Sequence, residues 1–409
     1  MANDRRYWTE TPLPDVIDFR EGPGILARDF RDEGVPLLRL AGLTGRSLLD
    51  GCNYLDAAKV ETRWSHFRLE IGDTLLSTSA SLGRVARVDA SAEGAIPYTG
   101  IIRMRPRSSS LLPDYVQYLL EDPGFTSQVS AMGAGSVMQH LGPSHLRHMK
   151  VRLPPLEAQT QIIAILGSID GKIQSNVRLI DAYSLALDRV HDHAIIDADQ
   201  VSLGDLGEIS GGGTPKTSVA EYWQPPDVPW LTPKDMTALR GVPCVWSGER
   251  GISRSGLARS SAKLLPAGTV LYTSRATLGI IAIAQQPLAT NQGFISIVPR
   301  PRLSSSFVYS TLMRCRNRIN ARAGGSTFPE VNKTNFKGVE CSLPGPAALK
   351  AHDAMAEPII THIAALACES RTLTKIRHAL LAKLVSGQLR VPLSNDPEEQ
   401  VGAAIEALA

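Results

Sequence analysis

The sequence predicts a mixed α/β (α+β) fold that is built twice, with each globular part followed by a long helix. Three observations predict it: an internal repeat, short strand-like segments in both halves, and two long stretches of helical periodicity. At 409 residues the chain is long enough for about two to four domains, each with its own core. A hydrophobic share of 43% and a charged share of 20% are typical of globular proteins.

The repeat is visible in segments of matching sequence. Residues 72–83, Gly-Asp-Thr-Leu-Leu-Ser-Thr-Ser-Ala-Ser-Leu-Gly, return at 268–279 as Gly-Thr-Val-Leu-Tyr-Thr-Ser-Arg-Ala-Thr-Leu-Gly. Further on, Gly135-Ser136 followed by Leu153-Pro154 returns as Gly325-Ser326 followed by Leu343-Pro344. A repeat about half the chain long is not a solenoid, whose period would be roughly 20–50 residues. It indicates a duplicated unit that performs two similar half-tasks.

Strands are expected where short runs rich in β-branched residues lie between Gly, Pro, Ser or Asn. These runs are Val35–Leu40, Thr74–Ser77, Arg84–Val88, Ile101–Met104, Val270–Thr273, Gly279–Ala284 and Gly293–Val298. One helix is expected near the end of each globular part, at Leu112–Leu120 and Ser306–Ala321. Such short elements favour an irregular sheet with long surface loops, where recognition residues usually sit.

The two long helices are predicted by residues that alternate in steps of four and three, the pattern of a coiled-coil seam. The first seam consists of Ile162, Leu166, Ile169, Ile173, Asn176, Ile180, Tyr183, Leu187 and Val190. The second consists of Ile359, Ile363, Leu366, Ser370, Leu373, Arg377, Leu380 and Leu384. Asn176 is interpreted as a polar residue that sets the register of the pair.

Two such helices bury their seams most simply against each other. Because each follows its own globular domain, we expect an antiparallel pair that holds the two domains apart. About 30 helical residues at ~1.5 Å each would span roughly 45 Å. The alternative is that each helix packs onto its own domain. The expected boundaries are 1–153 for the first domain, 154–197 for the central helix, 198–343 for the second domain, 344–392 for the C-terminal helix and 393–409 for a tail.

Familiar catalytic and metal-binding motifs are not found. The segment Gly211–Thr217 resembles a P-loop only superficially, since Pro215 replaces the second Gly, and a flexible turn is the better interpretation. Asp170-Gly171-Lys172 falls on a helix face rather than on the strand pair of a metal-dependent nuclease. The five cysteines form no CxxC pair, which argues against a zinc site and fits reduced thiols. We therefore expect a binding protein without catalytic residues, metal or cofactor of its own.

Charge and hydropathy narrow the location and the partners. The N-terminus lacks the apolar core of a signal peptide, and no run approaches the roughly 20 apolar residues of a membrane helix, so a cytoplasmic protein without membrane contact is expected. A net charge of +3 and a pI near 8.6 permit nucleic-acid binding without proving it.

Several further passages lie at corresponding points of the chain. Asp18–Ile25 and Gly34–Arg39 lie at the start of the first domain, and Ile209–Lys216, Glu221–Trp223 and Val228–Asp235 lie at the start of the second. Leu153-Pro154-Pro155-Leu156-Glu157-Ala158-Gln159 leads into the central helix, and Glu369–Leu373 and Ala379–Gly387 fall in the C-terminal helix. In these passages and in their order, essentially the whole chain resembles the specificity subunit of type I restriction–modification systems. The domain starts resemble those of its target-recognition domains, and the other passages resemble the start of its central helix, with Glu157 and Ala158 in swapped order, and its C-terminal helix.

The resemblance implies two target-recognition domains with a helical spacer between them. Each domain would read one half of a split, asymmetric target in double-stranded DNA. Two modification subunits carrying S-adenosylmethionine, and restriction/translocase subunits, would assemble around the chain and perform adenine methylation and cleavage. Seam residues such as Ile162, Leu166, Ile169, Ile173 and Asn176, with Ile359, Ile363, Leu366, Leu373 and Leu380, would support the spacer and the docking of partners. The second helix begins Leu343-Pro344-Gly345-Pro346-Ala347-Ala348-Leu349 without this signature, so a weaker second seat is expected if the signature seats partners.

DNA recognition needs hydrogen-bond donors for base edges and phosphates. The candidates in the first domain are Arg39, Arg63, Arg68, Arg84, Ser136 and Gln139; those in the second are Lys234, Arg275, Ser326, Lys333 and Lys337. The competing interpretation of any one of them is an exposed, solubilising charge. Arg103-Arg105-Arg107 and Arg314-Arg316-Arg318 are expected to be solvated surface. For the whole chain, the alternatives are a scaffold that joins proteins without binding DNA and a nuclease with a dispersed site.

Overall fold

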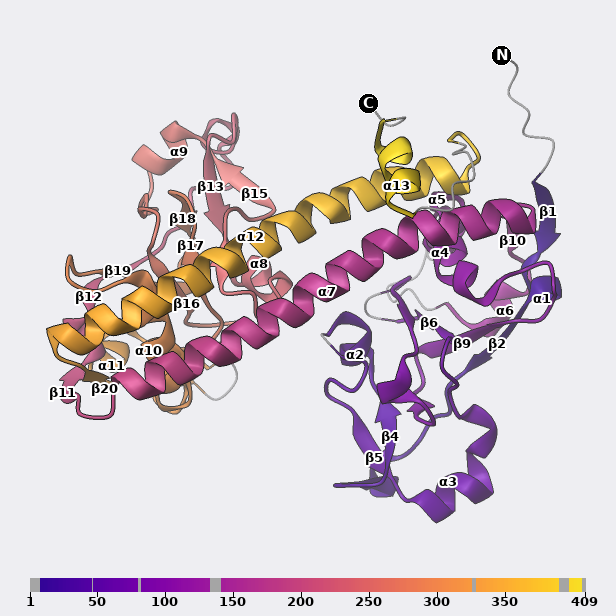
Figure 1. The fold of residues 1–409 in the computed structure, drawn as a ribbon, viewed down its shortest axis with the longest axis horizontal. Helices are drawn as coiled ribbons and strands as arrows, with labels where there is room; N and C mark the ends of the chain where they lie inside the picture. Colours follow the sequence, from indigo (N-terminus) through magenta and orange to yellow (C-terminus); the bar gives the residue numbers. More distant parts are fainter. Residues whose placement is uncertain are drawn as a thin grey trace. The chain divides into compact units, whose positions relative to one another are not determined.

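A computed structural model describes residues 8–45, 47–79, 82–132, 141–325, 329–389 and 397–406 (Figure 1). The chain divides into two compact units. Unit 1 combines Met1–Ile173 with Thr372–Ala409, and unit 2 is Gln174–Arg371. The division cuts each of the two long helices, α7 (Leu156–Ala194) and α12 (Pro346–Val385), so that both helices contribute to both units.

Unit 1 holds two four-stranded sheets and a two-stranded one. The first sheet has the order β2-β9-β6-β7, with β2 at Ile17–Glu21, β9 at Ile101–Pro106, β6 at Thr74–Ser77 and β7 at Val85–Arg87. The second has the order β3-β5-β4-β8, with β3 at Phe30–Arg31, β5 at Asn53–Leu55, β4 at Val35–Leu38 and β8 at Ile96–Pro97. The remaining pair is β1 (Thr9–Pro12) with β10 (Lys150–Leu153).

Short helices fill the connections of unit 1. They are α1 (Leu13–Val16), α2 (Leu40–Thr44), α3 (Ala57–Arg63), α4 (Val116–Glu121), α5 (Pro123–Met132) and α6 (Pro143–Leu146), with α13 (Pro397–Glu406) in the predicted tail. The predicted helix at Leu112–Leu120 is a 3-10 turn at Pro113–Tyr115 that continues as α4.

Unit 2 repeats this plan. Its larger sheet has the order β12-β19-β16-β17-β14, with β12 at Gly207–Gly211, β19 at Phe294–Pro299, β16 at Val270–Thr273, β17 at Ile281–Ala284 and β14 at Cys244–Val245. The smaller sheet is β15 (Arg250–Ile252), β13 (Val228–Leu231) and β18 (Ala289–Thr290), and β11 (Asp199–Ser202) pairs with β20 (Glu340–Leu343). The helices are α8 (Pro233–Ala238), α9 (Arg254–Ala258), α10 (Ser305–Asn320) and α11 (Lys333–Lys337).

Most strands of one unit have a counterpart in the other. β2, β9, β6 and β7 correspond to β12, β19, β16 and β17, and every neighbouring pair among them is antiparallel. The parallel pair β4·β8 corresponds to the parallel pair β13·β18. Among the described residues, β14 has no counterpart in unit 1 and β3 has none in unit 2. The predicted internal repeat is therefore confirmed at the level of sheet topology.

The repeated sequence around 72–83 and 268–279 is explained by backbone geometry. Gly72 and Gly268 precede the matching strands β6 and β16 with φ of 91° and 84°. Gly83 and Gly279 end the following turns with φ of 79° and 85°. Because side chains disfavour this left-handed region, each turn retains glycine at both positions.

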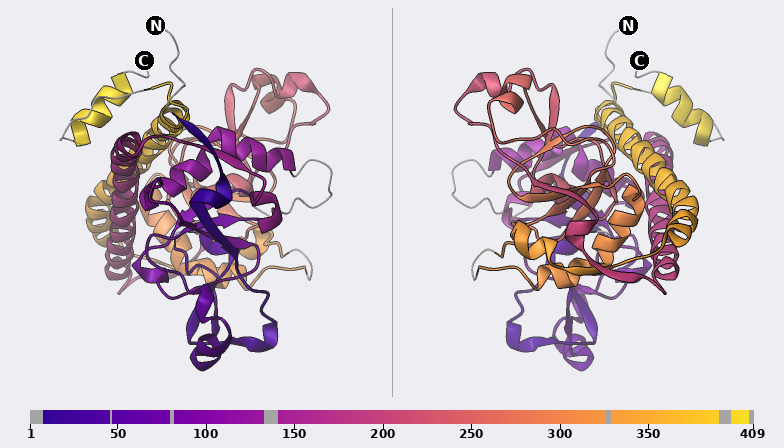
Figure 2. Two further views of the ribbon diagram at one scale, coloured as in Figure 1. Left: turned by 90° about the vertical axis from the view of Figure 1, so that its right-hand side faces the viewer. Right: turned by 90° about the vertical axis from the view of Figure 1, so that its left-hand side faces the viewer.

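The long helices run antiparallel within each unit and lie side by side (Figures 1 and 2). In unit 1 the start of α7, with Ile162, Ile165 and Leu166, shares a core with Leu380 and Leu384 near the end of α12. In unit 2, Ile180 of α7 packs with Ile363 and Ala367 of α12. Both helix segments also join the core of the adjacent globular part. The two arrangements considered from the sequence, helix on helix and helix on domain, thus occur together.

Polar residues interrupt this seam where the sequence predicted them. Asn176 is fully buried, and its amide donates to Glu369 Oε2 at 2.8 Å and to Ser370 Oγ at 3.2 Å. Arg377 pairs with Asp170 of α7 at 2.5 Å and with Glu121 of α4 at 2.7 Å. Burying a charge is costly unless it is paired, so these contacts favour one alignment of the helices over others.

The start of α7 is fastened to its own domain. Gln159 is fully buried; its Oε1 accepts from Leu112 N at 2.8 Å, and its Nε2 donates to Ser110 O at 2.7 Å. At the corresponding point of α12 stands Leu349, which packs in the apolar core of unit 2. The start of α7 is therefore fixed to its domain by hydrogen bonds, and the start of α12 by an apolar contact.

Candidate nucleic-acid interface

Four loops of unit 2 meet beyond the ends of β12, β16 and β18. Gly213 N donates to Thr290 O at 2.8 Å, Ser274 N to Gly293 O at 2.8 Å, and Val331 N to Ser274 O at 3.0 Å. We call these loops the second loop cluster: residues 211–217, 274–279, 290–293 and 331–337. Since backbone hydrogen bonds join them, their exposed side chains form one ordered surface.

The same junction exists in unit 1. Gly22 N donates to Ile101 O at 2.9 Å, Thr78 N to Gly100 O at 2.9 Å, and Leu141 N to Thr78 O at 3.0 Å. We call it the first loop cluster: residues 21–25, 78–79, 82–83, 97–100 and 141–147. The last two bonds are the counterparts of the Ser274–Gly293 and Val331–Ser274 bonds of unit 2. The duplicated framework therefore allows the side chains to be compared position by position.

The four basic candidates of the second domain lie in or beside the second loop cluster. Arg275 is half-buried in the turn after β16, where its neighbour Ala276 has a φ of 63°. Lys333 begins α11 and lies against Gly211, while Lys337 ends the same helix, and both are exposed. Lys234 lies on α8, which reaches the cluster through a 3.3 Å hydrogen bond between the Thr237 and Thr277 hydroxyls. Its ammonium pairs with Glu249 at 2.9 Å, which raises the pKa of Lys234.

The Gly-Gly-Gly segment is a tightly packed loop rather than the flexible turn that the sequence suggested. A Cβ at Gly212 would collide with the carbonyl of Asn291, and a Cβ at Gly213 would collide with Ser261. Trp230 Nε1 donates to Gly213 O at 3.0 Å, and Trp223 Nε1 donates to Lys216 O at 3.3 Å. Close backbone approach explains the glycines, and the two indoles hold the loop in place.

Sequence reasoning missed Gln292, the exposed tip of the turn between β18 and β19. Its amide accepts a hydrogen bond from Thr214, and the turn is closed by Gly293 N donating to Asn291 Oδ1 at 2.8 Å. The counterpart in unit 1 is Thr99, next to Gly100, whose N donates to Glu21 Oε1 at 3.2 Å. In the sequence, the short Asn-Gln-Gly turn before an apolar strand marks this position as a turn. Nothing in that pattern indicates that the turn takes part in binding.

The candidates of the first domain are more dispersed. Arg39 donates to Asn53 Oδ1 at 3.1 Å and lies 4.3 Å from the ring of Tyr98 in the first loop cluster. Arg84 directly follows Gly83 and is exposed. Arg63, also exposed, ends α3, whereas Arg68 donates to Gly94 O at 2.8 Å and pairs with Glu61. Thus Arg39 and Arg84 lie beside the cluster, and Arg68 is engaged in contacts within the domain.

Three further candidates, Ser136, Gln139 and Ser326, lie outside the described residues.

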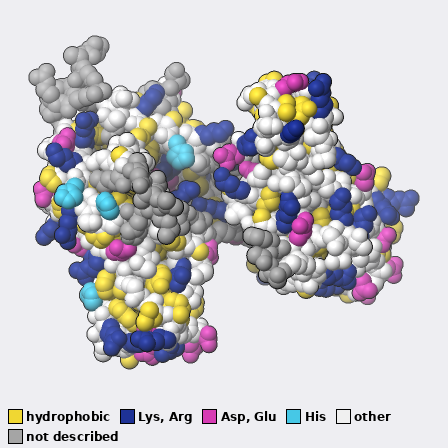
Figure 3. Space-filling view, turned by 180° about the vertical axis from the view of Figure 1, so that it is seen from behind, with side chains coloured by type: hydrophobic (Ala, Val, Ile, Leu, Met, Phe, Trp, Pro, Cys, Tyr) yellow, Lys and Arg dark blue, Asp and Glu magenta, His cyan; other side chains and the backbone are white. Residues whose placement is uncertain are grey.

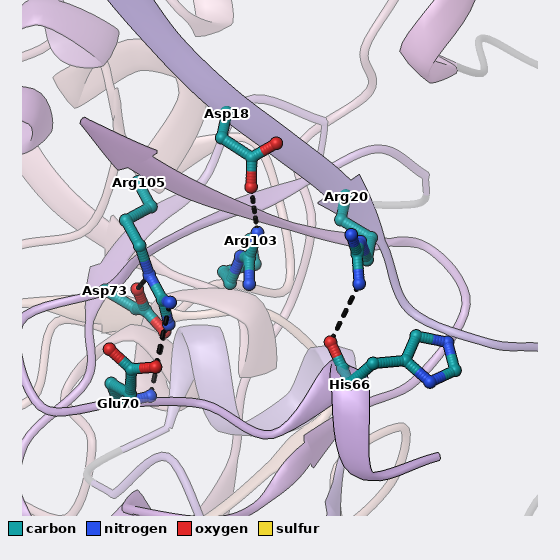
Figure 4. A network of polar contacts seen from close by, with 7 residues as sticks. All are labelled: Asp18, Arg20, His66, Glu70, Asp73, Arg103 and Arg105. Carbon is teal, nitrogen blue, oxygen red and sulfur yellow. Dashed lines mark hydrogen bonds and ion pairs between the residues drawn. The ribbon is translucent and has the colours of Figure 1, made fainter. Parts of the chain in front are cut away.

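The expectation that Arg103, Arg105 and Arg107 are solvated surface is wrong for the first two. Arg103 is buried and pairs with Asp18, while Arg105 binds Asp73 through Nε at 2.7 Å and Glu70 through Nη1 at 2.8 Å (Figure 4). Burial, followed by the charge of Arg105, lowers the pKa of Arg103; the hydrogen bond to Asp73 raises the pKa of Arg105. Their alternation along a strand was visible, but the facing carboxylates come from distant segments.

This network also distinguishes the two domains. Arg20 lies directly across from Arg103 in the sheet and donates to His66 O at 2.9 Å, which ties the segment after α3 to the sheet (Figure 4). The corresponding pair in unit 2 is Ser210 and Ser296. The shared framework therefore carries charged contacts in one copy and small hydroxyl residues in the other.

Metal sites and membrane-spanning helices are not found among the described residues. Within the described ranges, no group of three or more His, Cys, Asp or Glu side chains is placed to hold a metal ion. Among the helices that the structure describes, none is long and apolar enough to cross a membrane.

The two units thus share one framework and carry different surface side chains at matched positions. The family described as the type I restriction modification DNA specificity domain matches the chain twice, at residues 6–182 and 196–369. The two matches cover most of the chain, and the chain therefore belongs to this family. The predicted family and fold class are confirmed, and the family consists of specificity subunits rather than catalytic ones.

Individual relatives agree with this placement. The MjaIX specificity subunit of Methanocaldococcus jannaschii is 40% identical over 153 residues, which are 37% of this chain and only 35% of that protein. The putative MjaX specificity subunit of the same organism is 22% identical over 414 residues, 94% of each chain. The solved S subunit of a type I system from M. genitalium has a TM-score of 0.54 at 15% identity and covers 92% of this chain and 96% of its own, which shows the shared fold.

Proposed function

We propose that this chain is the DNA-reading subunit of a type I restriction–modification complex, with each loop cluster binding one half of a split target. The observation that carries the proposal is the duplicated framework with unlike side chains at matched loop positions. At matched positions the first cluster has Ser79 and Thr99 where the second has Arg275 and Gln292. Arginine and glutamine are side chains that read purines through paired hydrogen bonds, so the two half-targets should differ.

The candidate cations would serve two purposes. Arg275 and Lys333 lie in the second loop cluster, and Arg39 and Arg84 lie beside the first. Contacts to phosphates fix the orientation of a protein on the duplex, and contacts to base edges provide the specificity. Lys and Arg side chains are scattered over the visible face of both units among acidic ones, so recognition would depend on local clusters rather than on overall charge (Figure 3).

The chemistry would come from partner subunits. Two modification subunits that bind S-adenosylmethionine, and restriction/translocase subunits, would assemble with the chain in the cytoplasm, and the helix pair α7·α12 would be their docking surface. The chain itself would bind no cofactor. Support comes from membership of the specificity family and from the buried helix seams that stiffen the pair. A rigid spacer suits this task because protein geometry would set the separation of the half-sites.

Methylation of genomic DNA tests the proposal directly. The chain is co-expressed with the modification subunit of its own system, and methylated adenines are mapped by sequencing. We expect one split motif, made of two unlike halves with a fixed gap of unspecified bases. A stable complex that methylates no defined motif would contradict the proposal and would favour a scaffold without DNA specificity.

A further inference from the structure

We infer that the second domain has a basic arm, residues Arg250–Lys263, that binds DNA phosphates beside the second loop cluster. The inference rests on the proposed function and names a contact surface within it. The arm includes β15 and α9 and carries four cations, Arg250, Arg254, Arg259 and Lys263, without a single acidic residue between the first and the last.

Three of these cations have no ionic partner among the described residues. Arg254, Arg259 and Lys263 are exposed, and their side chains make no hydrogen bond or ion pair with any other part of the chain that the structure describes. The nearby carboxylate of Glu221 is engaged by Ser255 Oγ at 2.8 Å. Close cations without counterions attract an external anion.

The arm is held in a defined conformation. Ser253 N donates to Tyr222 O at 2.9 Å, and Ser253 Oγ caps α9 by accepting from Gly256 N at 2.9 Å. A Cβ at Gly256 would collide with Tyr222 O, so the chain approaches closely at this point. An ordered backbone lowers the entropy lost when long cationic side chains engage a ligand.

Two tryptophans connect the arm with the loop cluster. The Arg250 guanidinium lies 3.8 Å from the ring centre of Trp223, which meets Trp230 edge-to-face with centroids 5.2 Å apart. Trp230 in turn holds Gly213 through its indole N–H, and Ser261 of the arm packs against Gly213. Lys216, exposed in the same loop, extends the cationic surface toward the cluster. A duplex seated on the loops would therefore place backbone phosphates within reach of the arm.

The matching part of the first domain is built differently. Around α3, Lys59 pairs with Asp29, and Arg68 pairs with Glu61. Arg63 is the exposed cation of that helix end without a partner among the described residues. Neutralised cations release few counterions on binding DNA. The phosphate contacts of the complex should therefore be unequal, with the larger share in the second domain.

The test measures how DNA affinity depends on salt. The full chain, assembled with its modification subunit, is titrated with a fluorescent duplex of the methylated motif and with a random duplex. The variant Arg254→Gln, Arg259→Gln, Lys263→Gln is compared with Lys59→Gln, Arg63→Gln, Arg68→Gln, which removes the same formal charge. Each phosphate contact makes the slope of log affinity against log salt steeper by about 0.9. The slope measured for the arm variant, which lacks three cations, should therefore be shallower by about two to three.

Further readouts separate a phosphate contact from other causes. We expect the arm variant to bind the cognate and the random duplex more weakly by similar factors, and to retain the wild-type methylation motif and melting temperature. A second variant that keeps the charge, Arg254→Lys with Arg259→Lys, should bind with nearly the wild-type affinity. The variant Lys59→Gln, Arg63→Gln, Arg68→Gln should change the slope of log affinity against log salt by less than the arm variant does. An arm variant with an unchanged slope would overturn the inference, as would a loss confined to the cognate duplex. Absence of DNA binding by the wild-type complex would instead refute the proposed function.

Discussion

Ser79 and Arg275 occupy the same turn in the two loop clusters, and Thr99 and Gln292 occupy the same tip. Each pair has the same backbone hydrogen bonds around it, so the difference in side chain is not required by the fold. A repeat that holds its framework and changes these positions is suited to reading two unlike half-targets. At the residue scale, these four side chains are where the proposed specificity resides.

Another residue gives a prediction about pH. His191 is 1% exposed and packs against Phe307 and His352, with ring centroids 5.2 and 5.7 Å away. Burial, followed by the charges of His352 and Arg314, lowers the pKa of His191 to about 3. Below the unfolded pKa of about 6.5 the unfolded chain binds a proton that the folded chain excludes. Acidification from pH 7 to 5 should therefore cost about 2 kcal/mol of stability through this residue alone.

Thermal unfolding of His191→Phe at pH 7 and at pH 5 checks this. The aromatic replacement keeps the contact with Phe307 and removes the titrating group, so the variant should lose less stability on acidification than the wild type. Equal losses in wild type and His191→Phe would show that His191 does not titrate with folding.

At the scale of elements, the pairing of α7 with α12 depends on a few buried polar contacts within an apolar seam. Arg377, whose side chain is 12% exposed, joins Asp170 of α7 to Glu121 of α4 and lies 5.7 Å from the ring of Tyr118. Tyr118 also donates its hydroxyl hydrogen to Asp170 Oδ2 at 3.1 Å. Removing the cation would leave two carboxylates without a counterion in a half-buried site.

We therefore expect Arg377→Met to destabilise the folded chain by about 2 to 4 kcal/mol, somewhat less than for a fully buried pair because the carboxylates are partly exposed. Arg300→Met is the comparison, since Arg300 is 59% exposed and 3.9 Å from Asp205, and it should cost under about 1 kcal/mol. Urea unfolding followed by circular dichroism measures both. A similar loss in the two variants would mean that the ion pairs of Arg377 do not stabilise the helix pairing.

The elements were largely predictable because their signals are local. The seam residues follow one period along each helix, and Thr74–Ser77 and Val270–Thr273 match the observed strands. The long helices begin at Leu156 and Pro346, within the expected regions 154–197 and 344–392 but before the first seam residues, Ile162 and Ile359, since helix starts depend on anchors such as Gln159 and Leu349. The four cations of the basic arm were not among the candidates named from the sequence, because well-separated Arg and Lys residues have the pattern of ordinary surface charge.

At the scale of the whole molecule, the candidate site is made of side chains that are far apart in the sequence and come together only in the folded chain, so it could not be predicted from local patterns. Strand pairing brings Gln292 next to Thr214, and Arg103 pairs with Asp18 of the neighbouring strand. Neither contact has a sequence period. The resemblance to specificity subunits indicated DNA recognition, and two family matches confirm the family. The central claim that remains to be tested is that each domain reads its own half of the target.

Binding to half-altered duplexes tests this claim most directly. Once the methylated motif is known, the complex is titrated with duplexes in which the first half, the second half or neither has been changed. The variant Arg275→Ala, Gln292→Ala is compared with Ser79→Ala, Thr99→Ala at the matched turns.

We predict that the Arg275 and Gln292 changes cost about 1 to 3 kcal/mol of discrimination at one half of the target and leave the other half unaffected. The Ser79 and Thr99 changes should act on the opposite half. If either variant weakens discrimination at both halves equally, or if both variants act on the same half, then the two domains do not read separate halves of the target.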